Sequence, residues 1–462
     1  MCKRRYTSVS ADARGRIGAA GVLHPAWLVV LAVIVSLLAC GQHSDWVEFR
    51  GDGGRGHTRN AMNPPLGLRW EFALQSDQEA FAFNNLVVKD ETLYFGSTDG
   101  NFYAMNIETG YMDWVYRTDG AVNSVPFVDE ERVYFGSNDG HLYAVDRETG
   151  EEAWTHRAGR AVQSTVIKHD DKIVFGVDGR GVTFLSTEGD VLNRIENPIW
   201  LRVSLQVDED LLYVVPGPPE NPRSLGVYDI DAQRHTWLLP EELMAASWYS
   251  FPAVNDRRLF TQTSRISDGE MQYSAWALDR RDGSVEWRRE LTADFAGDPP
   301  QNLGGYFQEL TNILDFQAPA LWRDRVISAS GDNTLRAFEE ESGSIAWETS
   351  LANRTSSAPM TSGDVVFVGL HGDASGRTPS PSAGDASGRT PSPSAGDESA
   401  SGRQGETESR SPRLAAFSAR SGRLIWEFET EGAVLSPPVV AGRYMVFGTD
   451  ANVVYVLERV LG

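Results

Sequence analysis

Two stretches of this chain, LYFGSTDGNFYAMNIETGYMDWVYR (residues 93–117) and VYFGSNDGHLYAVDRETGEEAWTHR (residues 133–157), match each other at a shift of 40 residues. The shared positions run from Gly96 to Trp114 in the first stretch and from Gly136 to Trp154 in the second. Self-similarity at a fixed period of this length is typical of repeat architectures. The structure of one unit therefore predicts the fold of most of the chain.

Each unit has the pattern of four short strands. RVYFGS alternates and is rich in β-branched and aromatic residues, NDG is a hairpin turn whose glycine can take a positive φ, and HLYAVD alternates again. ETG then turns into the strand that carries Trp154, and a short strand such as NSVPFVD precedes the first pair. Such an antiparallel sheet has two apolar faces, so the units must stack face to face, and a radial array does this without long open edges.

The unit recurs with one spacing, in which an alanine, five residues, a glycine, three residues and a tryptophan follow one another. Five copies keep this spacing and end at Trp114, Trp154, Trp287, Trp347 and Trp426. Two weaker copies keep the spacing but change residues: Thr183, Gly189 and Asn193 in one, and Val227, Gln233 and Trp237 in the other. We predict that these tryptophans fill the gaps between neighbouring sheets. A row of ligand-stacking rings is the alternative, but their place is fixed relative to a turn and not to a common pocket.

An eighth unit begins at residue 433, but the chain stops before the strand that would carry its tryptophan. The stretch LRWEFAL (residues 68–74) has the form of that missing strand, and it stands ahead of the first unit. Trp70 would then complete the last sheet from the other end of the chain. The sequence thus predicts an all-β, eight-bladed propeller of four-stranded antiparallel blades over residues 63–462, with the ring closed by the N-terminal strand.

Two insertions separate otherwise regular units. Residues 371–412 contain GDASGRTPSPSA twice in tandem and almost nothing that could be buried, so we expect a disordered loop inserted in blade 7. Residues 293–316 instead carry apolar and aromatic side chains, among them Tyr306, Phe307 and Leu310. These three are candidates for a contact surface, and plain structural cover of the ring is the alternative.

The N-terminal segment is basic at its start and apolar over residues 26–40, which end in LLAC. Fifteen residues fall short of the ~20 that span a bilayer but suit the apolar region of a secretory signal. Leucine at −3 and alanine at −1 before Cys40 resemble a bacterial lipobox. We expect residues 1–40 to be a signal segment with the lipid on Cys40, and residues 41–62 to be a tether. An uncleaved anchor helix reaching back to Gly18 is the alternative.

Charge and residue usage exclude several classes of function. After Cys40 the chain has 37 basic and 63 acidic residues, a formal charge of −26 that repels nucleic acid. Cys2 and Cys40 are the only cysteines, so no disulfide or thiolate metal site can form after residue 40. No two of the eight histidines have metal-ligand spacing, and the chain has neither a phosphate-binding glycine loop nor a Gly-x-Ser-x-Gly elbow.

The acidic residues that recur are those of the DG turns: Asp99, Asp139 and, by position, Asp332 and Asp450. A turn role explains an aspartate that returns at the same place in successive blades. We therefore predict no catalytic, cofactor-binding or metal-binding residue in this chain.

The pattern YFGSxDGxLYAxDxxTGxxxW, together with DWVEFRGDGG ahead of the first strand, resembles the pyrroloquinoline-quinone (PQQ) repeat family over roughly residues 45–462. The family forms eight-bladed propellers. It includes periplasmic quinoprotein alcohol dehydrogenases and the BamB-type lipoproteins, which are non-enzymatic scaffolds in the assembly of outer-membrane β-barrel proteins.

The lipobox joined to a propeller resembles the second group. The resemblance implies a lipid-anchored, non-catalytic scaffold in the periplasm at the outer membrane, with an envelope protein as its partner and no cofactor. A PQQ-dependent oxidoreductase is the first alternative, although the enzymes of the family carry a vicinal cysteine pair and this propeller has no cysteine. A binder of carbohydrate or another small ligand in the central funnel is the second.

Overall fold

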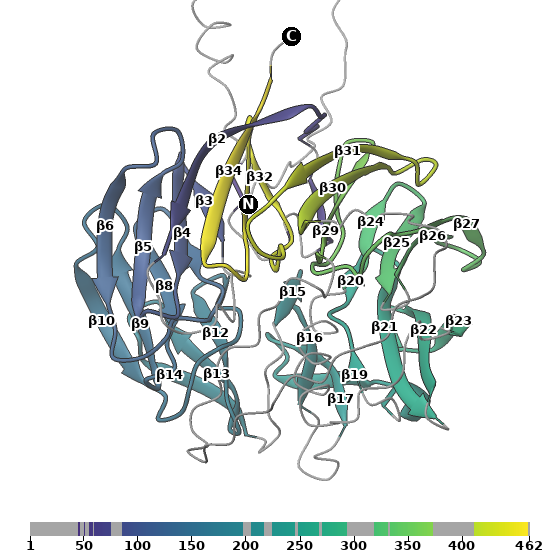
Figure 1. The fold of residues 1–462 in the computed structure, drawn as a ribbon. Helices are drawn as coiled ribbons and strands as arrows, with labels where there is room; N and C mark the ends of the chain where they lie inside the picture. The colour runs from purple at the N-terminus through teal and green to yellow at the C-terminus, as the bar shows by residue number, and fades with distance from the viewer. Residues whose placement is uncertain are drawn as a thin grey trace, which may run out of the picture. The chain divides into compact units, whose positions relative to one another are not determined.

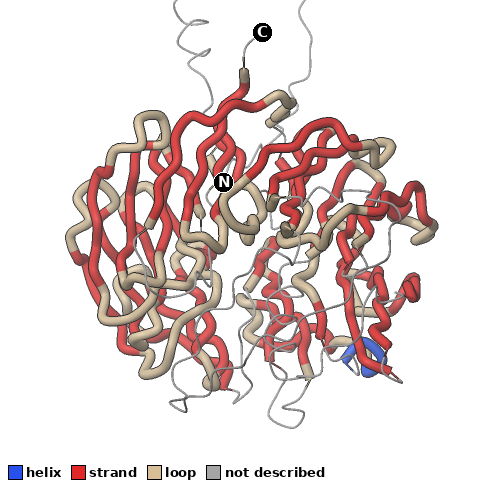
Figure 2. The backbone as a smooth tube through the Cα atoms, viewed as in Figure 1, coloured by secondary structure: helices blue, strands red, loops and turns tan. Residues whose placement is uncertain are grey.

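The computed structural model divides the chain into two units, Met1–His43 and Ser44–Gly462, and the residues that it describes belong to the second. These are residues 45–46, 50, 55–58, 60–74, 86–196, 205–216, 224–244, 248–267, 270–292, 318–330, 333–372 and 411–460. Nearly all of the regular structure among them is β-strand, and the short α2 (Glu241–Met244) is the helix that they contain (Figure 2).

Eight antiparallel sheets follow one another along the chain and stand around an axis (Figure 1). The first four blades are built from successive strands. They are β3 (Val87–Lys89), β4 (Thr92–Gly96), β5 (Asn101–Asn106) and β6 (Met112–Arg117) in blade 1; β7 (Phe127–Val128), β8 (Arg132–Gly136), β9 (His141–Asp146) and β10 (Glu152–Arg157) in blade 2; β11 (Ile167–His169), β12 (Lys172–Val177), β13 (Gly181–Ser186) and β14 (Val191–Glu196) in blade 3; and β15 (Gln206–Asp208), β16 (Leu211–Pro216), β17 (Leu225–Asp229) and β18 (Arg234–Leu238) in blade 4.

Of blades 5 to 8, blade 6 keeps this plan, whereas blades 5, 7 and 8 depart from it at their first or last strand. They consist of β19 (Trp248–Tyr249), β20 (Ala253–Val254), β21 (Arg258–Ser267), β22 (Glu270–Asp279) and β23 (Val285–Thr292) in blade 5; β24 (Ala320–Trp322), β25 (Arg325–Ser330), β26 (Thr334–Glu339) and β27 (Ile345–Ser350) in blade 6; β1 (His57–Thr58), β28 (Met360–Ser362), β29 (Val365–Leu370), β30 (Arg413–Ser418) and β31 (Leu424–Glu429) in blade 7; and β32 (Val439–Ala441), β33 (Tyr444–Gly448), β34 (Val453–Arg459) and β2 (Leu66–Ala73) in blade 8.

The predicted fold is confirmed, including the closure of the ring. β2 pairs antiparallel with β34, so that Trp70 lies opposite Val456, and the purple strand lies beside the yellow one in Figure 1. The first strands of neighbouring blades contact one another, as β3 does with β7 on one side and with β32 on the other, which places them nearest the axis. Strands from near the two ends of the propeller sequence are thus joined in one sheet by hydrogen bonds.

The hairpin between the second and third strands forms where the sequence predicts it. In blade 2, Gly136 pairs with Leu142 across the turn, and Gly140 has a φ of 90°. That value lies in the left-handed region that favours glycine. The DG pair therefore ends one strand and starts the next at the same place in each regular unit.

The core lies between blades. Second and third strands such as β8 and β9 are buried on both faces, whereas outer strands such as β10 alternate between exposed and half-buried residues. Phe102 of blade 1 and Phe135 of blade 2, both fully buried, stack with ring centroids 4.1 Å apart. Burying one such ring contributes ~2–3 kcal/mol, so stacking is what holds neighbouring blades together.

Candidate functional site

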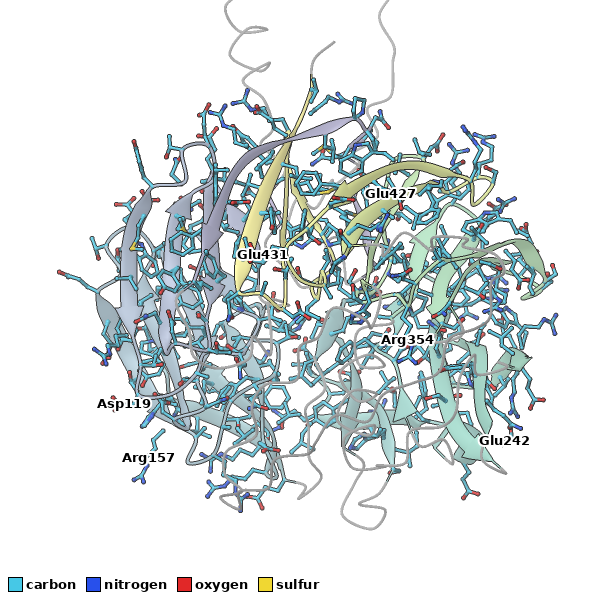
Figure 3. All side chains as sticks on the ribbon, viewed as in Figure 1. Asp119, Arg157, Glu242, Arg354, Glu427 and Glu431 are labelled. Carbon is cyan, nitrogen blue, oxygen red and sulfur yellow. The ribbon has the colours of Figure 1, made fainter. Side chains whose placement is uncertain are left out.

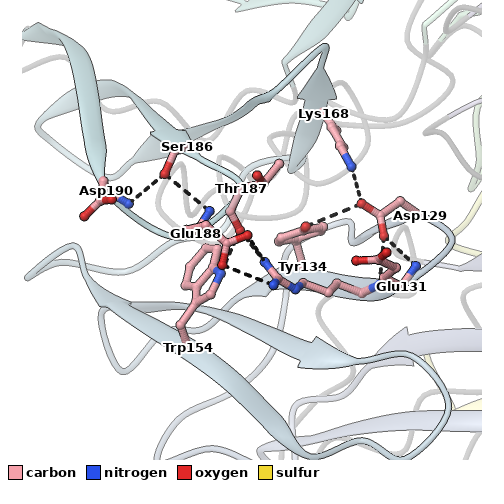
Figure 4. Close-up of polar contacts among 10 residues, drawn as sticks. Asp129, Glu131, Tyr134, Trp154, Lys168, Ser186, Thr187, Glu188 and Asp190 are labelled. Atoms are coloured by element: carbon pink, nitrogen blue, oxygen red, sulfur yellow. Dashed lines mark hydrogen bonds and ion pairs between the residues drawn. The ribbon is translucent and has the colours of Figure 1, made fainter.

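The seven predicted tryptophans all lie on outer strands, and six of them dock onto the following blade. In these six the indole N–H donates to a main-chain carbonyl in the turn between the third and fourth strands of the next blade, at 2.7 to 3.0 Å. The pairs are Trp70 with Ile107, Trp114 with Arg147, Trp154 with Thr187, Trp237 with Arg280, Trp287 with Glu340, and Trp347 with Ala419. Figure 4 shows the contact of Trp154 with Thr187.

A glycine of the same turn packs against the tryptophan. In blade 6, Gly343 has a φ of 64°, and a Cβ atom there would lie 2.6 Å from the indole of Trp287. Real Cβ atoms do not approach this closely, so the ring occupies the place of a side chain. The glycine and the tryptophan of one repeat unit therefore belong to different interfaces. The glycine contacts the tryptophan of the preceding blade, and the tryptophan contacts the glycine of the following blade.

The junction between blades 3 and 4 confirms that the tryptophan and the turn glycine occur together, because it has neither of them. Asn193 stands where β14 would carry a tryptophan, and its amide donates to the hydroxyl of Tyr228 at 3.3 Å. The turn of blade 4 has Gln233 in place of glycine, with a φ of 52°. Without an indole above it, the turn keeps the left-handed conformation and accommodates a side chain.

Trp426 is the seventh predicted tryptophan, and it lies at the seam of the ring. In blade 8 the chain ends meet where the other blades have a turn, since β34 ends at Arg459 and β2 begins at Leu66. Trp426 stacks on Phe428 at 6.0 Å, and its indole N–H has no acceptor among the described residues of blade 8. The last blade interface is therefore held by packing without the indole hydrogen bond.

The aspartates of the DG turns accept hydrogen bonds from their own turn or from a neighbouring connection. Asp139 accepts hydrogen bonds from the main-chain N–H of His141 at 3.0 Å and from the Tyr143 hydroxyl at 2.8 Å. Asp99 accepts the same two bonds in blade 1, and Asp450 accepts one from the Ala433 N–H at 2.7 Å. Burial raises the pKa of Tyr103 to about 12, so this phenol stays protonated and donates to Asp99. These carboxylates are already engaged as acceptors within the fold.

Several residues singled out in the sequence lie outside the described residues. They are Cys40, Asp332, the contact candidates Tyr306, Phe307 and Leu310, and residues 373–410 of the long insertion. Within the part of the chain that the structure describes, no helix is long and apolar enough to cross a membrane.

One cluster has the residue types of a metal site and could not be found from the sequence. His169 is the last residue of β11 in blade 3, Asp210 and Asp231 lie in turns of blade 4, and their ligand atoms lie within 4.8 Å of one another. His169 Nε2 lies 3.3 Å from Asp210, and Lys172 Nζ lies 3.2 Å from Asp231. Lys172 thus pairs with one carboxylate of the cluster, and we assign no metal to it.

A hollow of about 390 Å³ on blade 2 has an acidic lining. It is lined by Glu130, Glu131, Arg132, Asp146, Glu148 and Ala153. Glu130 pairs with Lys89 at 2.9 Å, and Arg132 donates to the Thr187 carbonyl and pairs with Glu188 at 3.0 Å. Charged side chains elsewhere, such as Arg157 and Glu242, stand out at the edge of the ring (Figure 3).

Comparison with known proteins gives one family. The family model described as outer membrane protein assembly factor BamB matches residues 67–199, 202–400 and 382–462. BamB of Kangiella koreensis is 38% identical to this chain over 52 residues, which are 11% of this chain and 13% of that protein.

Solved structures share the fold at low identity. BamB from Moraxella catarrhalis has a TM-score of 0.56 at 15% identity, with 85% of this chain and 100% of that chain covered. The quinohemoprotein alcohol dehydrogenase from Comamonas testosteroni has a TM-score of 0.60 at 16% identity, with 90% and 80% covered. Both likenesses show the propeller and nothing about activity.

Proposed function

Because this chain belongs to the family of the outer membrane protein assembly factor BamB, we propose that it is a non-catalytic scaffold that binds another protein of the cell envelope. The observation that carries the proposal is the family match, which extends over nearly the whole propeller from residue 67 to residue 462. The family name supports a role in the assembly of outer-membrane proteins.

The geometry of the ring supports a role without chemistry. The repeated aspartates that might supply a general base accept hydrogen bonds from their own turns, as Asp139 does from His141 and Tyr143. A base must be free to reach the proton that it removes. The likeness to quinoprotein dehydrogenases rests on 16% identity or less, so it supports no second function.

We propose further that the protein is lipidated on Cys40 and holds its propeller in the periplasm at the outer membrane. The apolar run that ends in LLAC supports this anchor. Replacing Cys40 with serine should abolish labelling by fatty acid, because the thiol is the acceptor. The matched control is Cys2→Ser, which removes the other cysteine of the chain and should leave labelling intact. A labelled Cys40→Ser protein would contradict the assignment.

The contact surface that we propose includes the insertion with Tyr306, Phe307 and Leu310. Photo-crosslinking amino acids at these three positions should capture the same envelope protein in living cells. Thr155, which is exposed on the outer strand β10 of blade 2, is the control position and should not capture it.

Loss of the protein should also lower the amount of folded β-barrel protein in the outer membrane, measured by heat-modifiable mobility on gels. Unchanged amounts would exclude the assembly role. Dye-linked alcohol dehydrogenase activity of the purified protein would exclude the scaffold.

A further inference from the structure

The residues ahead of β2 form a strap on the inner strands of several blades. We define the strap by its described residues: Asp45, Trp46, Arg50, 55–58 and 60–62. At blade 1 the N–H of Trp46 donates to the Val88 carbonyl at 2.8 Å, and the N–H of Val88 donates back to Trp46 at 3.0 Å. The Trp46 side chain is 3% exposed. The start of the strap is thus fixed on β3.

Nine residues later the strap is bound to the opposite side of the ring. Arg55 donates through Nε to the Val254 carbonyl of β20 in blade 5 at 3.0 Å. The Arg55 carbonyl accepts from the N–H of Leu321 in β24 of blade 6, also at 3.0 Å. In a ring of eight blades, blade 5 lies opposite blade 1. Trp46 and Arg55 are therefore bound to inner strands on opposite sides of the axis.

Beyond Arg55, the strap adds a fifth strand to blade 7. β1 runs parallel to β28, with His57 opposite Thr361 and Thr58 opposite Ser362. The Thr361 N–H donates to the Gly56 carbonyl at 2.8 Å, and the N–H of Met62 donates to the Ser362 hydroxyl at 2.7 Å. The strap thereby ends on the blade next to the seam.

Arg50 and Gly56 hold the middle of the strap together. The Arg50 guanidinium donates from Nη2 to the carbonyls of Ala318 at 3.1 Å and Pro319 at 2.7 Å, and the residue is 3% exposed. Gly56 has a φ of 61°, and a Cβ atom there would lie 2.4 Å from Arg50 Nη2. Any other residue at position 56 would displace the arginine from its two acceptors.

We infer that the strap is a built-in occupant of the axis of the ring and excludes PQQ and sugars from it. Small ligands of ring-shaped folds enter the central channel, where they need free donors and acceptors. Here the strap already uses the main-chain groups of Val88, Val254 and Leu321 on three inner strands. A quinone needs cations facing its carboxylates, and the guanidinium of Arg50 is committed to carbonyl groups. The described groups of the strap and of the inner strands that it binds therefore do not fit the cofactor.

Hydrogen exchange tests whether the strap covers the inner strands. The Gly56→Ala variant should speed exchange at the amides of Thr361 and Leu321 by at least about tenfold, since each loses a strap carbonyl. Gly442→Ala is the matched control, because Gly442 has a similar φ of 57° and its Cβ would meet nothing within 4 Å. It should leave both amides protected. Equal exchange in the two variants would overturn the inference.

Ligand titration tests the exclusion itself. We expect no saturable absorbance change when PQQ is added to the full chain with Ca²⁺. The PQQ concentration should reach 100 times a dissociation constant of ~1 μM, which a working site would have. Saturable binding while Thr361 stays protected would overturn the inference, because strap and quinone would then coexist.

If the Gly56→Ala variant does not fold, a disulfide cross-link tests the position of the strap instead. Cysteines in place of His57 and Thr361, which are opposite each other in β1 and β28, should form a disulfide in the folded protein. Folded protein in which they remain reduced under oxidising conditions would also overturn the inference. None of these experiments depends on an envelope partner, so their failure is distinct from failure of the scaffold role.

Discussion

Trp287 and Gly343 show how one interface is divided between two blades. The tryptophan is 7% exposed, donates to Glu340 at 2.9 Å and lies where a side chain on Gly343 would have to be. The glycine and the tryptophan of one unit keep a fixed spacing in the sequence although they belong to different interfaces. Each of them contacts a residue of a neighbouring unit. The junction of blades 3 and 4 follows the same rule, because Asn193 replaces the tryptophan on one side and Gln233 replaces the glycine on the other.

Truncation of Trp287 to alanine should lower the free energy of unfolding by about 3–5 kcal/mol, because a large cavity opens and a hydrogen bond is lost. Trp426→Ala should cost less, since that indole lacks the bond to the next blade. Urea unfolding curves of the two variants check this.

In a double-mutant cycle, Gly343→Ala should lower the free energy of unfolding less in the Trp287→Ala background than in the parent, with a coupling energy of about 0.5–3 kcal/mol. Additive costs would show that the two residues do not share the space.

Asp129 should give the protein part of its acid sensitivity. It accepts from the main-chain N–H groups of Glu131 at 2.9 Å and Arg132 at 2.7 Å, and it pairs with Lys168 of blade 3 (Figure 4). Burial raises the pKa of this carboxyl, but the bonds from Lys168 and the two N–H groups outweigh burial and hold it below its ordinary value.

A carboxyl with a lowered pKa stabilises the fold above its unfolded pKa of ~3.9 and loses that contribution as the pH falls through the folded pKa. Asp129→Asn should therefore be less stable than the parent at pH 6, and the difference should shrink below about pH 4. Thermal unfolding at a series of pH values measures it. A difference that stays constant down to pH 2 would show that the ionised carboxyl contributes nothing.

At the scale of elements, the long insertion of blade 7 joins two strands that the fold has already aligned. Leu370 at the end of β29 pairs with Arg413 at the start of β30. Beyond this pair, a Cβ atom on Gly372 would lie 2.7 Å from Pro412, so the two ends of the insertion are in contact. The residues between them are not needed to bring the strands together.

Deleting residues 373–410 and joining Gly372 to Ser411 through a two-residue turn should change the free energy of unfolding by less than about 1 kcal/mol, because loop-closure entropy varies slowly with length. Chemical denaturation of the shortened protein measures the change. In the parent chain, limited proteolysis should cut first within 373–410. A folded core that is cut elsewhere before this segment would contradict the predicted loop.

For the whole molecule, stability depends on the meeting of residues far apart in the chain. β2 contributes the outer strand of blade 8, where Leu66 lies opposite Arg459 and Ala73 opposite Val453. Without it, β34 would become an open edge and the core cluster that contains Met62, Leu66 and Val456 would lose one side. The ring is a closed unit only when both ends of the described chain are in place.

Removal of residues 1–74 should therefore destabilise the protein as severely as removal of the last blade from Val434 onward. A chain that begins at Asn63 keeps β2 and loses the strap, and it should be more stable than the chain that begins at residue 75. Thermal unfolding of the three truncated proteins checks the order. Equal melting temperatures for the chains that begin at 63 and 75 would show that β2 does not close the ring.

The sequence by itself determined the number of blades, the strands within each blade and the closing role of LRWEFAL. The strands follow from local alternation and from turn glycines such as Gly140, which act over a few residues, and the number of blades follows from the period of the repeat along the chain. Only the tertiary structure decided which partner each tryptophan has, since the indole of one unit binds the turn of the next. It also decided where the described residues between 45 and 62 bind, in a segment whose composition predicts a tether. Their contacts with blades 1, 5, 6 and 7 exist only after the ring has brought those inner strands around one axis.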